Sequence, residues 1–110
     1  MTRTRTILAS FALLLATAAF AQPKDDVLLE MRDAFRQGNK ARLAQLLPAA
    51  RGHALEPWAA YWELRARLDT ATPAEVQDFL TRYAGTYQED RLRNDWLQLL
   101  GQRRDWTTFA

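Results

Sequence analysis

The 110-residue sequence contains no cysteine and a single histidine, His53. The absence of cysteine excludes disulfide bonds, a thiol nucleophile, cysteine-ligated zinc and a lipid attached to cysteine. One histidine argues against a histidine-rich metal site, and no phosphate-binding loop, nucleotide fingerprint or nucleophile elbow occurs. We therefore expect no metal and no cofactor. Glycine and proline are scarce, with four of each, and this composition excludes collagen-like, low-complexity and disordered chains.

The net charge of +2 depends on the first residues of the chain. Two arginines precede residues 7–20, a run of 14 residues without any charged side chain, and an Ala-Phe-Ala sequence follows at its end. A basic start, an apolar run and a small-x-small site are the parts of a secretory signal peptide. The pattern therefore predicts a signal peptide over residues 1–21 that is cleaved between Ala21 and Gln22. The alternative is a buried N-terminal helix.

Removal of this segment changes what the chain can bind. The apolar run is shorter than the roughly 20 residues that a membrane-spanning helix needs, so we expect no stable membrane anchor. Arg3 and Arg5 leave with the signal peptide, so 13 basic residues remain against 13 acidic ones. A neutral chain lacks the electrostatic footprint of a nucleic-acid-binding protein, and we expect no nucleic-acid partner. The expected product is a neutral periplasmic domain over residues 22–110.

From residue 25 onward apolar residues recur with the period of a helix, and no stretch alternates as a strand would. The pattern predicts five helices and the start of a sixth. Gly38 is expected to end the first helix, and Pro48 to end or bend the second, because proline removes an interior hydrogen bond. Residues 51–54 are expected to form a loop. The expected N-terminal caps of the later helices are Asn39, Thr72, Thr86 and Asp105.

The first, third and fifth helices are expected to begin near residues 26, 56 and 87, which are 30 and 31 residues apart. A near-constant period with two helices per unit is typical of a helical repeat array. We therefore predict an all-α fold of paired antiparallel helices in a TPR-like α-superhelix. The alternative is a plain helical bundle.

The end of the sequence predicts that this superhelix is incomplete. Trp106 and Phe109 form an apolar pair with nothing after them to cover it, so we expect the front part of a longer protein. The apolar stripe of the fifth helix is then expected to lack part of its covering surface and to drive self-association of the isolated segment. This stripe consists of Leu92, Trp96, Leu99 and Leu100.

Three stretches carry a resemblance to a known family. They are LLEMRDAFRQGNKARLAQLLPA, HALEPWAAYWELRARLD and EVQDFLTRYAGTYQEDRLRNDWLQLLGQRRDWTTFA. Their most specific parts are Leu55-Glu56-Pro57-Trp58 with Tyr61, and Arg103-Arg104-Asp105-Trp106 after a Leu-rich helix. Over residues 25–110 the chain resembles the N-terminal region, or U-domain, of soluble lytic murein transglycosylases. These signatures concern packing and turns, so they indicate a superhelix more than a chemistry.

The resemblance implies a periplasmic protein several times longer than this chain, most of it an α-superhelix bent into a ring. It also implies a C-terminal lysozyme-like domain that cleaves the MurNAc–GlcNAc bond of peptidoglycan. One glutamic acid acts there as general acid and then as general base, and the 1,6-anhydro product makes the enzyme a lyase. The family's catalytic glutamate lies in a Glu-Ser dipeptide, with Gly-Leu-Met-Gln downstream, and neither string occurs here.

The resemblance therefore implies a non-catalytic N-terminal scaffold segment of a peptidoglycan lytic transglycosylase. No catalytic residue is expected in this chain, and glycan strands are bound through the full-length parent. The alternative is a complete small periplasmic helical-repeat module that binds a protein partner.

Carboxylates are the side chains that glycan cleavage requires. The candidates are Asp25, Asp26, Glu56, Glu63, Glu89 and Asp90. The two adjacent pairs fall in the first turn of an expected helix, where negative charge complements the helix dipole. Glu56 and Glu63 share the third helix, but a single carboxylate without a visible pocket is not a site. We expect Glu63 and Arg67 to form an ordinary surface pair.

The aromatic side chains offer a second kind of site, because aromatic rings stack on sugars. The candidates for a carbohydrate surface are Trp58, Tyr61, Trp62 and Trp96. Their helical spacing is also what core packing produces, and we expect them to be core. His53 lies in a predicted loop without an evident partner, and we expect no role for it. The arginines are expected to form a solvated face.

Overall fold

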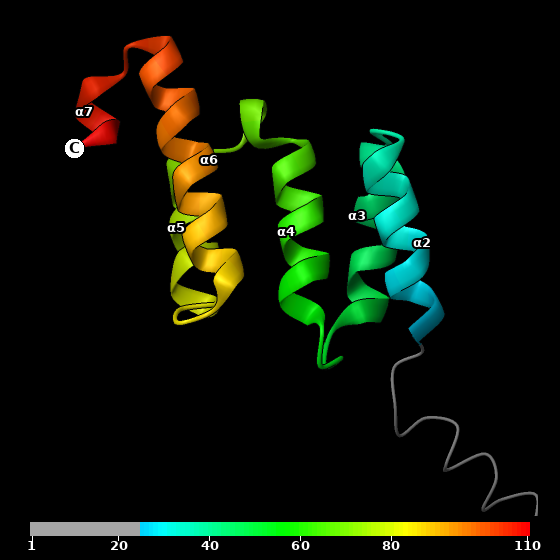
Figure 1. The fold of residues 1–110 in the computed structure, drawn as a ribbon. Helices are drawn as coiled ribbons and strands as arrows, with labels where there is room; N and C mark the ends of the chain where they lie inside the picture. Colours follow the sequence, from blue (N-terminus) through cyan, green and yellow to red (C-terminus); the bar gives the residue numbers. More distant parts are fainter. Residues whose placement is uncertain (1–24) are drawn as a thin grey trace, which may run out of the picture.

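The computed structural model describes residues 25–110, which form helices and connecting loops without any strand (Figure 1). The elements are α2 (Asp25–Arg36), α3 (Lys40–Ala50), α4 (Glu56–Ala66), the short 3-10 helix η1 (Leu68–Thr70), α5 (Pro73–Arg82), α6 (Tyr87–Arg103) and α7 (Trp106–Phe109). The all-α prediction is confirmed. Within these residues no helix has the length and apolar character needed to cross a membrane. The predicted cleavage site at Ala21 and Gln22 lies outside the described residues.

Local signals in the sequence account for the helix ends. Each predicted cap accepts a hydrogen bond from the backbone N–H three residues further on, at 3.1–3.2 Å. These caps are Asn39, Thr72, Thr86 and Asp105. Gly38 follows α2 with a φ of +68°, a conformation that glycine adopts without steric cost. The expectation that Pro48 ends the helix is wrong, because α3 continues to Ala50. Pro48 stands in the last turn, where proline costs the helix only one hydrogen bond.

The helices form two layers. α2, α4 and α6 lie side by side and run in the same direction, and α3 and α5 pack behind them in the opposite direction (Figure 1). α4 contacts α2 and α3 on one side and α6 on the other, while α6 also contacts α5 and α7. α4 is therefore the central helix of the described part of the chain.

Two clusters of buried residues make the core, and α4 contributes to both. The first cluster joins α2 and α3 to α4 and consists of Leu28, Met31, Ala34, Leu43, Ala50 and Ala59. The second joins α4 to η1, α5 and α6, and consists of Ala60, Tyr61, Leu64, Leu68, Ala71, Val76, Phe79, Tyr83, Leu92, Trp96 and Leu100. Leu47 and Trp62 pack against both clusters, so the apolar interior is continuous across α4.

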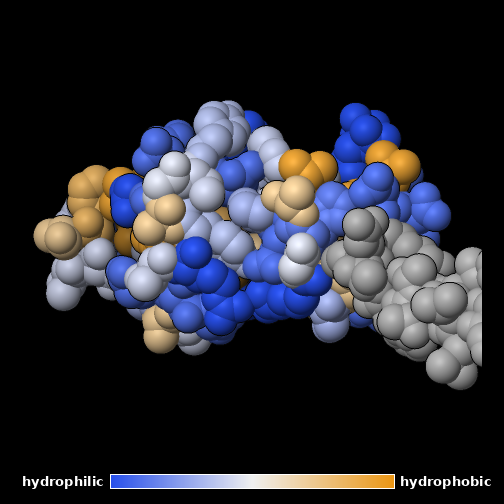
Figure 2. Space-filling view, turned by 90° about the horizontal axis from the view of Figure 1, so that it is seen from below, coloured by the Kyte–Doolittle hydropathy of each residue, from blue (hydrophilic) through white to orange (hydrophobic). Residues whose placement is uncertain are grey.

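The apolar stripe of α6 is better covered than the sequence predicts. Leu92 is fully buried, and Trp96 and Leu100 are buried as well, because they belong to the cluster that α4, α5 and α6 share. Leu99 is only partly buried and packs against this cluster. Trp106 and Phe109 of α7 are instead the exposed pair, with 59% and 42% of their surface accessible. Figure 2 shows a largely hydrophilic face with hydrophobic surface at its left end and in smaller separate patches along its upper edge.

Candidate functional site

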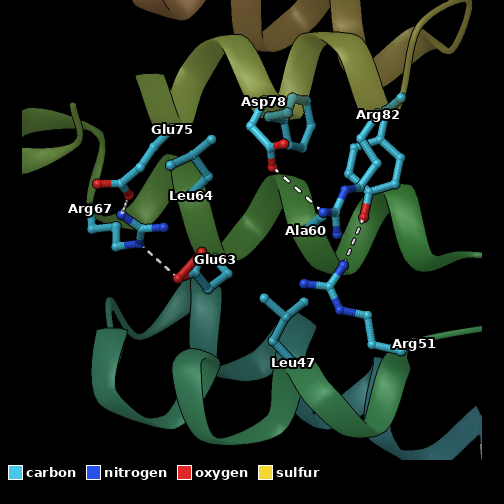
Figure 3. A pocket seen from close by; sticks show the side chains of 11 residues that line it. Leu47, Arg51, Ala60, Glu63, Leu64, Arg67, Glu75, Asp78 and Arg82 are labelled. Carbon is cyan, nitrogen blue, oxygen red and sulfur yellow. Dashed lines mark hydrogen bonds and ion pairs between the residues drawn. The ribbon is translucent and has the colours of Figure 1, made fainter. Parts of the chain in front are cut away.

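A groove runs behind α4, between α3 and α5, with a volume of about 140 Å³ (Figure 3). Apolar side chains form its floor, among them Leu47 and Leu64. Charged side chains occupy its two ends. At each end these groups bind one another, so the groove offers few unused polar atoms.

Glu63, Arg67 and Glu75 close one end of the groove. Arg67 donates from Nε to Oε1 of Glu63 at 2.7 Å, and from a second nitrogen to Glu75. The hydrogen bond to Glu63 raises the pKa of Arg67, and the hydrogen bond from Arg67 lowers the pKa of Glu75. The expectation of an ordinary surface pair is wrong, because only 9% of Glu63 is exposed. Glu75 comes from α5, so Arg67 joins a carboxylate of α4 to one of α5.

Glu56 and Tyr83 meet at the other end. Glu56 accepts hydrogen bonds from the hydroxyl of Tyr83 at 2.6 Å and from the backbone N–H of Gly52 at 2.8 Å, and Arg51 lies 3.7 Å away. The hydrogen bond from Tyr83 lowers the pKa of Glu56. Burial, and then the bond to Glu56, raises the pKa of Tyr83 to about 12. Glu56 is therefore ionised at neutral pH and is unsuited to act as a general acid.

We expect Tyr83→Phe to lower the free energy of unfolding by about 1.5 kcal/mol at neutral pH, the lower end of the range for a hydrogen bond to a charged group. The substitution removes the hydrogen bond to Glu56 and the longer one, at 3.4 Å, that the hydroxyl accepts from Arg51. The pKa of Glu56 is below its ordinary value of 4.5, so the bond's contribution is complete above that pH and is lost as pH falls through the folded-state value. The pKa of Tyr83 is above its ordinary value of 10.0, so the contribution is complete below that pH and is lost as pH rises toward about 12.

Urea unfolding over a series of pH values measures the loss of this contribution at acidic and at alkaline pH. Tyr83→Phe should show a weaker pH dependence than wild type at each end of the range. Tyr87→Phe is the control, because Tyr87 is exposed and its hydroxyl accepts a hydrogen bond from an arginine, Arg91. Identical pH profiles for Tyr83→Phe and wild type would contradict the assignment.

A second hollow opens on the front layer, between α2 and α4. We call it the aromatic hollow. Its volume is about 280 Å³, and it is lined by Leu28, Leu29, Arg32, Leu55, Trp58 and Trp62. The expectation of core packing is correct for Tyr61 and Trp96, which are buried, whereas Trp58 and Trp62 are only half-buried. Two of the four candidate rings are thus accessible to a ligand.

Two further aromatic side chains pack against the tryptophans of this hollow, and an arginine lies next to one of them; none of the three was predicted as a site residue. Phe35 of α2 lies 6.5 Å from Trp62 between ring centroids, and Tyr87 of α6 lies 5.8 Å from Trp58. Arg91 lies one helical turn after Tyr87. Tyr87 and Arg91 are spaced at i and i+4, which places both on one side of α6, away from the buried stripe. The i, i+4 spacing of a tyrosine and an arginine is visible in the sequence and could have indicated this pair.

Arg91 is held by hydroxyl groups. Its Nε donates to the Tyr61 hydroxyl at 3.1 Å, and a terminal nitrogen donates to the Tyr87 hydroxyl at 3.2 Å. The Tyr61 hydroxyl in turn donates to Asp95 at 2.6 Å, and Asp95 forms an ion pair with Arg65 at 3.3 Å. The carboxylate of Asp95 is therefore satisfied by these two partners, and Arg91 is oriented by neutral ones.

His53 has two partners, so the expectation of none is wrong. Its Nδ1 accepts a hydrogen bond from the backbone N–H of Leu55 at 2.9 Å, and its Nε2 lies 2.6 Å from the carboxylate of Asp25. With Nδ1 as acceptor, the proton of the neutral ring is on Nε2 and is donated to Asp25. The contact fixes the loop before α4 against the start of α2, and so places Leu55 at the rim of the aromatic hollow.

The remaining acidic candidates lie in the first turns of helices, where negative charge complements the helix dipole. Asp26 is exposed in the first turn of α2, and Glu89 and Asp90 lie in the first turn of α6. Glu89 accepts from the backbone N–H of Gly85 at 3.1 Å and pairs with Arg93. Within residues 25–110 no group of three acidic or histidine side chains is arranged to hold a metal ion.

The aromatic hollow is thus an accessible site that combines partly exposed aromatic rings with neighbouring arginines, whereas charged groups of the groove behind α4 bind one another at both of its ends. Comparisons of the sequence with protein-family models and with curated proteins, and of the structure with solved structures, give no match.

Proposed function

We propose that this chain is the N-terminal, non-catalytic scaffold segment of a periplasmic peptidoglycan lytic transglycosylase. In this proposal the pairs α2–α3, α4–α5 and α6–α7 are successive units of a TPR-like α-superhelix. The main support is the regular spacing of the front layer. α2, α4 and α6 begin at Asp25, Glu56 and Tyr87, which are 31 residues apart in both cases, and consecutive members contact each other. Nearest-neighbour contacts at a fixed period are typical of a repeat array.

The carboxylates agree with a scaffold role. A general acid for glycan cleavage needs a raised pKa in a formed cleft. The pKa values of Glu56 and Glu75 are lowered instead, and Glu63 is bound to Arg67. In this proposal the chemistry, which leaves 1,6-anhydro ends, belongs to a lysozyme-like domain of the full-length parent. The parent binds the glycan strands, and the segment described here forms part of its ring-shaped α-superhelix.

Sequencing the gene beyond the codon for Ala110 tests the proposal. The expected result is an open frame that continues through further helical pairs and reaches a Glu-Ser dipeptide followed by Gly-Leu-Met-Gln. The full-length product should clear peptidoglycan in a zymogram, whereas residues 1–110 alone should leave it intact. A stop codon directly after Ala110 would refute the proposal and favour the alternative, a small periplasmic helical-repeat module that binds a protein partner.

Export has its own test. We expect the protein in the periplasmic fraction to begin at Gln22, because Ala21 ends a small-x-small site after an apolar run. Mass spectrometry of the N-terminal peptide measures this directly. An intact N-terminus starting at Met1, recovered from washed membranes, would contradict both the signal peptide and the periplasmic location.

The exposed pair at α7 supports the further proposal that the isolated segment self-associates. Trp106 and Phe109 pack against each other at 5.7 Å between ring centroids, and both are open to solvent. Contiguous apolar surface of this kind is a common site of protein contact.

A further inference from the structure

The guanidinium of Arg91 is oriented but has no carboxylate partner within residues 25–110. Both of its hydrogen bonds go to tyrosine hydroxyls, and its central carbon lies 5.6 Å from the ring centroid of Tyr61. The ring and the two hydroxyls restrict the rotation of the side chain, yet they leave its positive charge uncompensated. The residue is exposed, so a carboxylate from another molecule can reach the remaining N–H donors.

The aromatic hollow begins beside this group. Trp58 lies 6.0 Å from Tyr61 and 5.8 Å from Tyr87, which are the two rings that hold Arg91. Trp58 also lines the hollow. Trp58 and one of the two tyrosines therefore lie between the hollow and Arg91, a separation that two side chains a few residues apart in one extended peptide can span.

The size and lining of the hollow limit what it can hold. Its volume of about 280 Å³ is just below the roughly 300–1,000 Å³ of pockets that enclose a whole small molecule. Three leucines and two tryptophans line it, and Arg32 supplies its only charge. A sugar requires hydrogen-bonding groups around its ring for the hydroxyls, and this lining offers almost none. A large apolar side chain meets no such requirement.

The charges around the hollow favour an acidic partner. Arg32 lies on the α2 side and is 47% exposed, with only a 3.9 Å contact to its neighbour Asp33. Arg91 lies on the α6 side. The nearby carboxylate of Asp95 is engaged by Arg65 and Tyr61 and does not neutralise Arg91. A ligand with a carboxylate and an apolar group complements both features.

We propose that the aromatic hollow and Arg91 form a docking site for an extended peptide that carries a large apolar side chain and, a few residues away, a carboxylate. The apolar side chain fills the hollow, and the carboxylate binds the guanidinium in a bidentate manner, the geometry that arginine favours. Tryptophan, tyrosine and arginine are also the residues that dominate binding energy at protein interfaces. The inference does not depend on the proposed function, because it rests on the front layer alone.

The test is a display library of random short peptides, selected on the full chain in its wild-type form and in three variants. Arg91→Gln removes the carboxylate anchor. Leu55→Ser makes the rim of the hollow polar, and serine is favoured at this helix-capping position, so folding should be kept. Arg93→Gln is the control, since it removes the same charge from a residue of α6 whose partners are Glu89 and Asp90. Circular dichroism confirms that each variant is folded.

We expect wild type and Arg93→Gln to enrich peptides with an acidic residue a few positions from a large apolar one. Arg91→Gln should bind an enriched peptide about tenfold more weakly or worse, and Leu55→Ser should also lose affinity. Replacing the acidic residue of the peptide by its amide should weaken binding to wild type but have little further effect on Arg91→Gln.

Three outcomes would overturn the inference. One is the absence of any enriched peptide, and another is an enriched peptide whose affinity is the same for Arg91→Gln and wild type. The third is binding of soluble glycan chains that Arg91→Gln abolishes, without any peptide enrichment, which would assign this surface to a sugar. The proposed function is tested by the sequence of the gene beyond the codon for Ala110. None of these binding results changes that test, so the two proposals can fail independently.

Discussion

Trp96→Ala is expected to lower the free energy of unfolding by about 3–5 kcal/mol, the usual cost of truncating a buried tryptophan. Trp96 is 8% exposed and belongs to the cluster that joins α4, α5 and α6, together with Leu92 and Leu100. Small domains are stable by only about 5–15 kcal/mol, so this loss is a large fraction of the total. Urea unfolding followed by circular dichroism should show a midpoint far below that of wild type.

Trp106→Ala is the matched control, because the same truncation occurs at a residue that is mostly in water. Its free energy of unfolding should change little. The loss of unfolding free energy in Trp62→Ala should lie between those of Trp96→Ala and Trp106→Ala, since part of the Trp62 ring is already exposed at the aromatic hollow. Equal destabilisation by Trp96→Ala and Trp106→Ala would show that the cluster around Trp96 is not the core.

The second large effect is expected from Arg67→Met, at about 1.5–3 kcal/mol. The substitution keeps most of the aliphatic stem but leaves the carboxylate of Glu63 without its partner, in a site where its side chain is only 11% exposed. The loss should be smaller than the roughly 3–5 kcal/mol found for fully buried pairs, because the Arg67 side chain is itself 35% exposed. Chemical denaturation at neutral pH measures the difference.

A double variant separates the ion pair from general packing. Glu63→Leu combined with Arg67→Met removes both charges and should recover part of the stability lost in Arg67→Met. Arg82→Gln is the surface control, because the Arg82–Asp78 pair is exposed and its atoms are 3.7 Å apart, so the change should be at most about 0.5 kcal/mol. Strictly additive effects in the double variant would contradict a buried pair.

The helices were predictable because their signals are local. Thr72 followed by Pro73, Thr86 followed by Glu89, and Gly38 after an amphipathic run each determine a helix end within a few residues. Pro48 was misjudged because its effect depends on its distance from the end of the helix, which the apolar pattern does not define.

The side-chain environments were harder to predict because they depend on contacts between distant segments. The second carboxylate bound to Arg67, Glu75, belongs to a different helix from Glu63, namely α5. The partner of His53 is Asp25, which lies 28 residues earlier. The half-exposure of Trp58 and Trp62 depends on how α2 lies against α4, since helical spacing alone does not distinguish a ring in the core from one in an open hollow.

The position of α4 between the two core clusters has a consequence for how the molecule unfolds. Ala59 faces the first cluster, while its neighbours Ala60 and Tyr61 face the second. Loss of α4 would therefore remove one wall from both clusters at once, so neither half retains a closed interior without it. We infer that α2 to α6 open as one cooperative unit, and that α7, which buries no residue of its own, exchanges its amide hydrogens first.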